Sequence, residues 1–164
     1  MSSGVPESQP AIRPFRIGDR EALRALIVDS FSGVTLEQNV GELLGVLNGH
    51  DWRWRKARHV DEDIAADPDG IFVVESAGTL VGAVTTRKDL PAGRGRIVNL
   101  AVAAPYRGHG LGRALIEHAL DAFRAAGLSY VVIETMAHNE AGQHLYPACG
   151  FIEVARQIHY ARRL

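Results

Sequence analysis

The stretch that decides the fold reads RIVNLAVAAPYRGHGLGRALIEHALDAFRAA and covers residues 96–126. It begins with the mostly apolar run Arg96 to Ala103, which predicts a buried β-strand. It ends with apolar residues that repeat every three or four positions, which predicts an amphipathic helix stopped by Gly127. Between the two lies a turn that holds glycine at positions 108, 110 and 112. The sequence therefore places a glycine-rich turn where a strand passes into a helix.

The turn from Arg107 to Gly112 has the features of an anion site. A helix N-terminus presents unpaired N–H groups and the positive end of the helix dipole, so it can hold a pyrophosphate without a lysine. A P-loop would need Lys followed by Ser or Thr where this chain has Arg113-Ala114, and the dinucleotide fingerprint would need a glycine at Arg113. Alternating glycines can also do no more than ease a tight turn, so the pattern alone leaves two interpretations open.

The elements on either side of the turn predict a mixed α/β fold. Tyr130 to Met136 reads as a buried strand, and a strand–helix–strand unit of this length implies a right-handed crossover with two parallel strands. Phe151 to Tyr160 supplies a closing strand. The other expected elements are a strand over Ile12–Ile17, a helix over Asp19–Phe31, a helix opened by a Thr35–Gln38 capping box, a hairpin of residues 71–75 and 80–86, and a short helix capped by Asn139.

Composition indicates one compact domain over residues 11–164, preceded by a flexible tail of residues 1–10. The 164 residues are 46% hydrophobic and 23% charged, which is ordinary globular composition. A formal net charge of -1 disfavours nonspecific nucleic-acid binding. The single Cys149 excludes an internal disulfide, and the sequence shows no signal peptide or apolar run of membrane-spanning length. We expect a soluble cytoplasmic protein that binds neither nucleic acid nor membrane.

The turn resembles the coenzyme A motif of the GNAT superfamily of N-acetyltransferases, Gln/Arg-x-x-Gly-x-Gly/Ala, at Arg107, Gly110 and Gly112. Asn139, followed by Leu145-Tyr146 and Gly150-Phe151, resembles the second signature of the superfamily. The resemblance covers roughly residues 70–160. It implies a mixed, mostly antiparallel sheet flanked by helices, with a V-shaped splay between two parallel strands near Leu100 and Tyr130 that admits acetyl-CoA.

The resemblance further implies that an acetyl group passes from acetyl-CoA to a primary amine, directly in a ternary complex. Main-chain groups of Leu100 to Val102 would hold the pantetheine, with the Val102 N–H polarising the thioester. Tyr146 is similar to the superfamily's general acid, although a half-buried tyrosine can also simply staple a helix to the sheet. The residues expected to bind the cofactor are Leu100, Ala101, Val102, Arg107, Gly108, His109, Gly110, Leu111, Gly112, Arg113 and Asn139.

The general base has several candidates. Glu134 precedes Asn139 by five residues and resembles the glutamate of ribosomal-protein alanine acetyltransferases that takes the proton from the amine. A glutamate at a strand end is more often solvated or ion-paired, so this alternative stays open. Glu75 is a weaker candidate, and a chain of water molecules could serve an acceptor with an α-amine.

The acceptor is open: a small-molecule or peptide amine fits equally well. Two rival functions are a noncatalytic acyl-CoA sensor and a transferase of a longer acyl group. Seven histidines without metal-ligand spacing predict no metal site. A homodimer is an expectation from the family only. Trp52 and Trp54 could wall the acceptor pocket, cover the core or join subunits, and the basic cluster around them reads as a solvated helix face.

Overall fold

The computed structural model describes residues 10–164, so the predicted flexible tail lies outside the described residues except for Pro10. The strands are β1 (Ile12–Pro14), β2 (Ile71–Ser76), β3 (Thr79–Asp89), β4 (Arg94–Val102) and β5 (Tyr130–Ile133). The α-helices are α1 (Arg20–Ser30), α2 (Leu36–Leu44), α3 (Trp52–Ala66), α4 (Leu111–Ala125) and α5 (Glu140–Ala148). None of the described helices is both long and apolar enough to cross a bilayer.

The five strands form one sheet in the order β1-β2-β3-β4-β5. The first four strands pair antiparallel, and β4 pairs parallel to β5 across the α4 crossover. The mostly antiparallel sheet with one parallel pair confirms the predicted fold class. The β2–β3 hairpin turns at Ala77 and Gly78, both with positive φ, which suits the tight connection predicted there.

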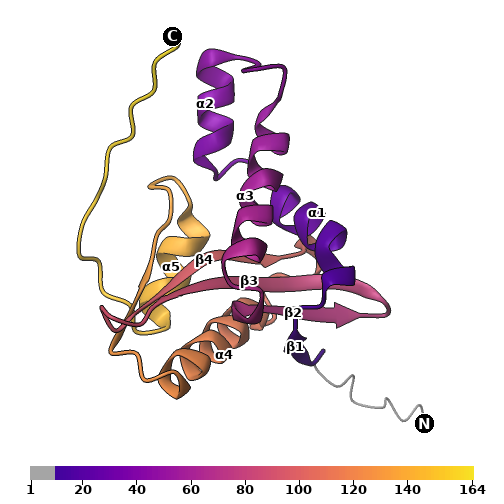
Figure 1. Cartoon of the computed structure of the whole chain (residues 1–164), viewed down its shortest axis with the longest axis vertical. Helices are drawn as coiled ribbons and strands as arrows, with labels where there is room; N and C mark the ends of the chain where they lie inside the picture. Colours follow the sequence, from indigo (N-terminus) through magenta and orange to yellow (C-terminus); the bar gives the residue numbers. More distant parts are fainter. Residues whose placement is uncertain (1–9) are drawn as a thin grey trace.

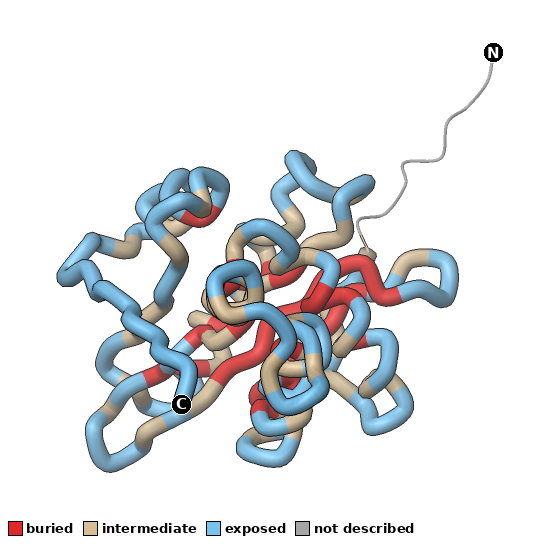
Figure 2. Tube along the Cα trace, turned by 90° about the horizontal axis from the view of Figure 1, so that it is seen from above, coloured by how far each residue is buried: buried red, intermediate tan, exposed pale blue. Residues whose placement is uncertain are grey.

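Helices cover both faces of the sheet, as Figure 1 shows: α1 and α3 lie on one face and α4 on the other. Leu23 and Ile27 of α1 and Val60 of α3 pack on one face, and Leu115 and Phe123 of α4 pack on the other. The trace in Figure 2 is buried mainly along the central strands. The amphipathic spacing of α1 and α4 in the sequence is thus explained by two separate apolar layers.

A β-bulge in β4 opens the sheet next to β5. The register with β3 shifts between Thr85 and Thr86, which leaves Val98 without a partner of its own. Pairing with β5 extends only from Arg94↔Tyr130 to Ile97↔Ile133. The strands therefore part beyond Ile97 and Ile133. The splay was predicted near Leu100 and Tyr130, but Tyr130 belongs to the paired end.

The predicted closing strand, Phe151 to Tyr160, is wrong. Residues 151–164 have no regular secondary structure, and Figure 1 shows them running away from the sheet past α2. Phe151 packs on the α4 layer, whereas the alternating apolar side chains beyond it are 79–90% exposed: Ile152, Val154, Ile158 and Tyr160. The alternation of apolar residues fits a β-strand, but a strand also needs backbone hydrogen bonds to a neighbouring strand. Residues 151–164 pair with none of the described strands.

Two local predictions on the helical side also need correction. Thr35 precedes α2, but its side chain makes no cap hydrogen bond, and Gln38 Oε1 accepts from Gly33 N (2.6 Å) instead of from Thr35. The charged stretch after Trp52 forms α3, capped by Asp51, and it is not uniformly a solvated face. Lys56 and Asp63 are 8% and 3% exposed, because both point at the polar residues of the sheet.

Candidate active site

The glycine-rich turn ends in a helix N-terminus that no side chain of residues 10–164 caps. Gly110 is the N-cap of α4, and the first intrahelical bond runs from Ala114 N to Gly110 O (3.0 Å). The N–H groups of Leu111, Gly112 and Arg113 therefore remain available to an anion. Gly108 and Gly110 have φ of 78° and 83°, a left-handed conformation that glycine adopts without strain. An added Cβ at either glycine would meet no described atom within 4 Å. The turn therefore needs glycine at these two positions for its backbone conformation and not for lack of space.

The free edge of β4 leads up to this turn. Ala103 N donates to Val81 O (2.9 Å), so these two residues form a hydrogen-bonded pair. Along an antiparallel ladder, hydrogen-bonded pairs of residues alternate with pairs that are not hydrogen-bonded. Val102, opposite Gly82, and Leu100, opposite Val84, therefore direct their main-chain groups away from β3. They face the side from which β5 has diverged. A polar main-chain edge that no strand covers can bind an extended ligand as an added strand would.

Arg107 and Arg113 hold the turn to its neighbours. Arg107 Nε donates to Val102 O (2.9 Å), which ties the turn to the end of β4. Arg113 donates to Ala148 O at the C-terminal end of α5. Gly112 lies against α5, since an added Cβ would be 3.3 Å from Leu145. The turn and the second signature segment therefore lie next to each other in space.

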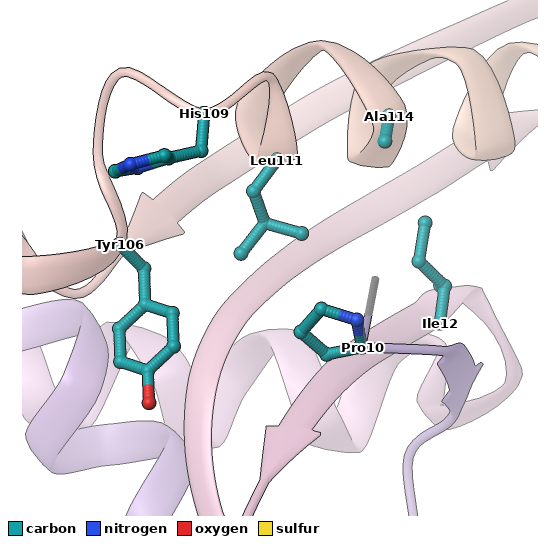
Figure 3. Close-up of a pocket in the computed structure, with 6 residues that line it drawn as sticks. All are labelled: Pro10, Ile12, Tyr106, His109, Leu111 and Ala114. Carbon is teal, nitrogen blue, oxygen red and sulfur yellow. The ribbon is translucent and has the colours of Figure 1, made fainter. Parts of the chain in front are cut away.

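His109 lies on the other side of the turn, in a pocket of about 300 Å³ lined by Pro10, Ile12, Tyr106, His109, Leu111 and Ala114. Figure 3 shows the His109 ring near Tyr106 and the β1 residue Ile12 across the pocket. Since β1 and β5 are opposite edges of the sheet, this pocket is separate from the splay.

Tyr146 lies on α5 and packs with the apolar layer that also contains Leu100, Val102 and Leu111. Its ring meets Phe151 edge to face, with centroids 6.3 Å apart. Burial raises the pKa of the Tyr146 phenol, with a smaller contribution from Cys149, so the phenol stays protonated at neutral pH. Asn139 caps α5: its Oδ1 accepts from Gly142 N (3.3 Å) and its Nδ2 donates to Thr135 Oγ1 (2.9 Å).

Glu134 directly follows β5 at the mouth of the splay. Its carboxylate accepts from Arg96 of β4 (3.0 Å), and its side chain is 63% exposed. The ion pair joins the two strands at the point where their ladder stops. Glu75 lies on β2, two strands from β4, and pairs with Arg13 (2.7 Å), which places it away from the splay.

Comparison with known proteins agrees with this geometry: residues 38–151 match the acetyltransferase (GNAT) family. The chain belongs to this family. Over 96 residues it is 33% identical to N-alpha-acetyltransferase 30 of Schizosaccharomyces pombe, a match that covers 57% of this chain and 64% of that protein. Over 116 residues it is 32% identical to mycothiol acetyltransferase of Thermobispora bispora, covering 68% of this chain and 39% of that protein.

Solved structures show the same fold. A chain of the NatC complex bound to Gag peptide and CoA matches with a TM-score of 0.69 and 21% identity, over 91% of this chain and 88% of that one. This chain spans less than two thirds of the length of the curated relatives described above. The resemblance to the GNAT superfamily that the two sequence motifs indicated is confirmed.

This GNAT chain also contains a buried polar network that the motifs did not reveal. Asn99 of β4 donates through Nδ2 to Asp63 Oδ2 (2.7 Å) and Thr85 Oγ1 (2.8 Å). Its Oδ1 accepts from Lys56 Nζ (2.7 Å), and Asp63 also accepts from Arg87 (2.7 Å). The one sequence signal was Asn99 itself, a polar residue within the apolar run of residues 97–102.

The network borders a cavity of about 340 Å³ on the α3 side of the sheet, lined by Lys56, His59, Glu62, Asp63, Arg87, Arg96, Val98 and Asn99. Val98 reaches it because the bulge breaks the alternation of β4. Ile97 and Leu100 pack on the α4 layer, whereas both Val98 and Asn99 line the cavity. The bulge therefore both opens the splay and places two adjacent β4 residues on the opposite face.

Proposed function

We propose that the chain is an N-acetyltransferase that moves the acetyl group of acetyl-CoA to a primary amine by direct transfer in a ternary complex. One observation carries the proposal: an uncapped helix N-terminus stands at the end of a strand whose main-chain edge faces the splay. The names of the relatives support it, since they describe acetyltransferases with different acceptors. The transferase unit is proposed to comprise residues 11–164.

In this proposal the coenzyme lies along the splay and ends at the turn. The N–H groups of Leu111, Gly112 and Arg113 would bind the pyrophosphate, with the Arg107 guanidinium at the rim. Pantetheine would pair with the free N–H and C=O groups of Leu100 and the free N–H of Val102, since Val102 O already accepts from Arg107. The further residues proposed to contact acetyl-CoA are Ala101, Gly108, Gly110, Asn139 and, through its main chain only, His109, because the His109 side chain lines the separate pocket.

The transfer needs only two proton steps. The neutral amine nitrogen attacks the thioester carbonyl carbon, the C–S bond breaks, and the electron pair leaves with sulfur. The Val102 N–H would stabilise the negative charge that develops on the carbonyl oxygen. The phenol of Tyr146 would protonate the departing thiolate, and the amine would lose its proton to Glu134. No covalent enzyme intermediate is required.

The environments of the two side chains support these roles to different degrees. The raised pKa of Tyr146 keeps its proton in place until a thiolate forms nearby, and it would later be restored from solvent. Glu134 faces the mouth of the splay but is paired with Arg96. An acceptor amine would have to compete with Arg96 for that carboxylate or reach it through water.

The test is a turnover assay on a panel of small-molecule and peptide amines, with release of the CoA thiol as the readout. Tyr146→Phe is expected to lower kcat by roughly 10²-fold or more while acetyl-CoA affinity is retained, because only the proton donor is lost. Tyr160→Phe is the control, since Tyr160 is 90% exposed. Wild-type binding without turnover on any amine would support the noncatalytic sensor. Equal activity of both variants would remove Tyr146 from the mechanism.

A further inference from the structure

Among the described residues 10–164, the cavity beside Asn99 contains one Lys or Arg cation that forms no ion pair, Lys56. Its other charged walls are paired: Asp63 with Arg87 (2.7 Å), Arg96 with Glu134 (3.0 Å), and Glu62 with Arg58 (3.4 Å). Lys56 forms no ion pair within residues 10–164, and its one hydrogen bond there is to the neutral Asn99. The cavity wall therefore carries an excess of one positive charge, and that charge is on Lys56.

Lys56 is held in place as a buried binding group would be. The side chain is 8% exposed, and its Nζ lies 4.0 Å from the centroid of the Phe31 ring. Asn99 cannot rotate to release it, because both hydrogens of the Asn99 amide are used by Asp63 and Thr85. An ammonium has three N–H donors, and one is engaged by Asn99. The remaining donors can serve a ligand in the cavity.

The cost of burying this charge indicates a missing partner. Burial lowers the pKa of Lys56 to about 8, even though Asp63 and Glu37 act in the opposite direction. A buried ammonium is stabilised most when a carboxylate hydrogen-bonds to it. Asp63 does not supply this bond within residues 10–164: its Oδ1 accepts from Arg87 and its Oδ2 from Asn99, and Lys56 donates to Asn99 instead.

The cavity also lies next to the proposed reaction centre. Asn99 precedes Leu100, and the strand rise of about 3.3 Å per residue puts Val98 within roughly 7 Å of Leu100. A ligand in the cavity would thus reach the thioester from the α3 face, since Asn99 and Ala101 share that face of β4. This step rests on the proposed function, because it assumes that Leu100 to Val102 hold the thioester.

We propose that this cavity is the acceptor site and that Lys56 binds a carboxylate of the acceptor, which makes the acceptor a small amine that also carries a carboxylate, such as a free amino acid. The acceptor's amine would lie toward Leu100 while its carboxylate accepts hydrogen bonds from Lys56. Lys56 thereby sets specificity and takes no part in the proton transfers. A peptide N-terminus, whose first carboxyl group is an amide, would leave the ammonium without its partner.

Two sets of amines test this inference: the common free amino acids and their carboxamides, which share amine and side chain but differ in charge. For each pair, kcat/KM is measured with acetyl-CoA and expressed per unprotonated amine, because amidation lowers the amine pKa. We expect wild type to favour the acid by about tenfold or more for the amino acids it accepts. Lys56→Gln should abolish this preference, and it keeps an N–H donor for Asn99 Oδ1. The chain has only one other lysine, so Lys88→Gln is the matched control.

Binding of the products gives a second readout that needs neither turnover nor a variant. N-acetyl amino acids and their amides are titrated calorimetrically into the wild-type CoA complex, and the acids should bind at least about tenfold tighter. Equal binding of acids and amides, or of neither, overturns the inference. So does a wild type that prefers amides, or a Lys56→Gln variant that loses activity on both sets alike. If CoA itself does not bind, the proposed transferase function fails separately, and binding of the acids to the free chain still tests the cavity.

Discussion

The substitution Gly110→Glu is expected to weaken acetyl-CoA binding by about a hundredfold, because it places a negative charge at the N-terminal end of α4. Gly110 is the N-cap residue, and its α-carbon adjoins the N–H groups proposed to hold the pyrophosphate. Its φ of 83° also disfavours any residue with a Cβ, at a cost of about 1–2 kcal/mol in stability. The added Cβ itself meets no described atom within 4 Å, so the chain should still fold.

The electrostatic part of the effect can be estimated. A carboxylate about 5 Å from one phosphate charge, at an effective dielectric constant near 20, is repelled by about 3 kcal/mol. That energy corresponds to roughly a hundredfold weaker binding. Gly110→Ala has the backbone strain without the charge, so the difference between the Glu and Ala variants isolates the repulsion.

Calorimetric titration of acetyl-CoA is the assay, with circular dichroism and urea unfolding as checks on the fold. Gly127→Glu is the matched control: Gly127 has φ of 76°, an added Cβ there meets nothing within 4 Å, and it follows the opposite end of α4. Fifteen helical residues put that charge about 22 Å from the turn, beyond the screening length at physiological salt. Unchanged affinity in a folded Gly110→Glu variant, or equal loss in both variants, would refute the proposed coenzyme site.

Three further perturbations probe the base, the buried lysine and the core. Glu134→Gln should lower kcat by about a hundredfold while acetyl-CoA affinity stays unchanged. The control is Glu117→Gln, at an exposed position of α4. Full activity of Glu134→Gln would indicate that a chain of water molecules acts as the base. Because burial lowers the pKa of Lys56 from 10.5 to about 8, the unfolded chain binds more protons between these values. As pH rises from 8 to 10.5, the unfolding free energy of wild type should therefore increase by up to about 3 kcal/mol relative to that of Lys56→Gln. Urea unfolding of both proteins across this pH range measures the effect. A difference in unfolding free energy that stays constant with pH would exclude the lowered pKa. Gly95→Ala would put a Cβ 2.9 Å from the Phe123 ring and should destabilise the fold by about 1–3 kcal/mol in urea, whereas Gly18→Ala, with open space, should not.

Much of the fold was predictable from local patterns. The apolar spacing of α1 and α4, the β2–β3 hairpin and the Asn139 cap of α5 depend on residues close together in the chain, and all are present. The parallel pairing of β4 and β5 followed from the length of the crossover between them. The end of the chain was not predictable in this way. Its alternating apolar residues satisfy the pattern of a strand, but only the neighbours available in space decide whether a ladder forms.

The same division holds for the site. The sequence by itself determined the family and the glycine-rich turn, because the turn's chemistry comes from consecutive backbone N–H groups at one helix end. Only the tertiary structure revealed the β4 bulge, the splay that follows it, and the cluster of Lys56, Asp63 and Asn99. Lys56 and Asn99 are 43 positions apart, and in sequence Lys56 is one more cation in a charged helix. Packing of α3 against the sheet buries this lysine, and within residues 10–164 it has no ion-pair partner. Burial depends on how the chain packs in three dimensions, so the order of residues in the sequence does not reveal it.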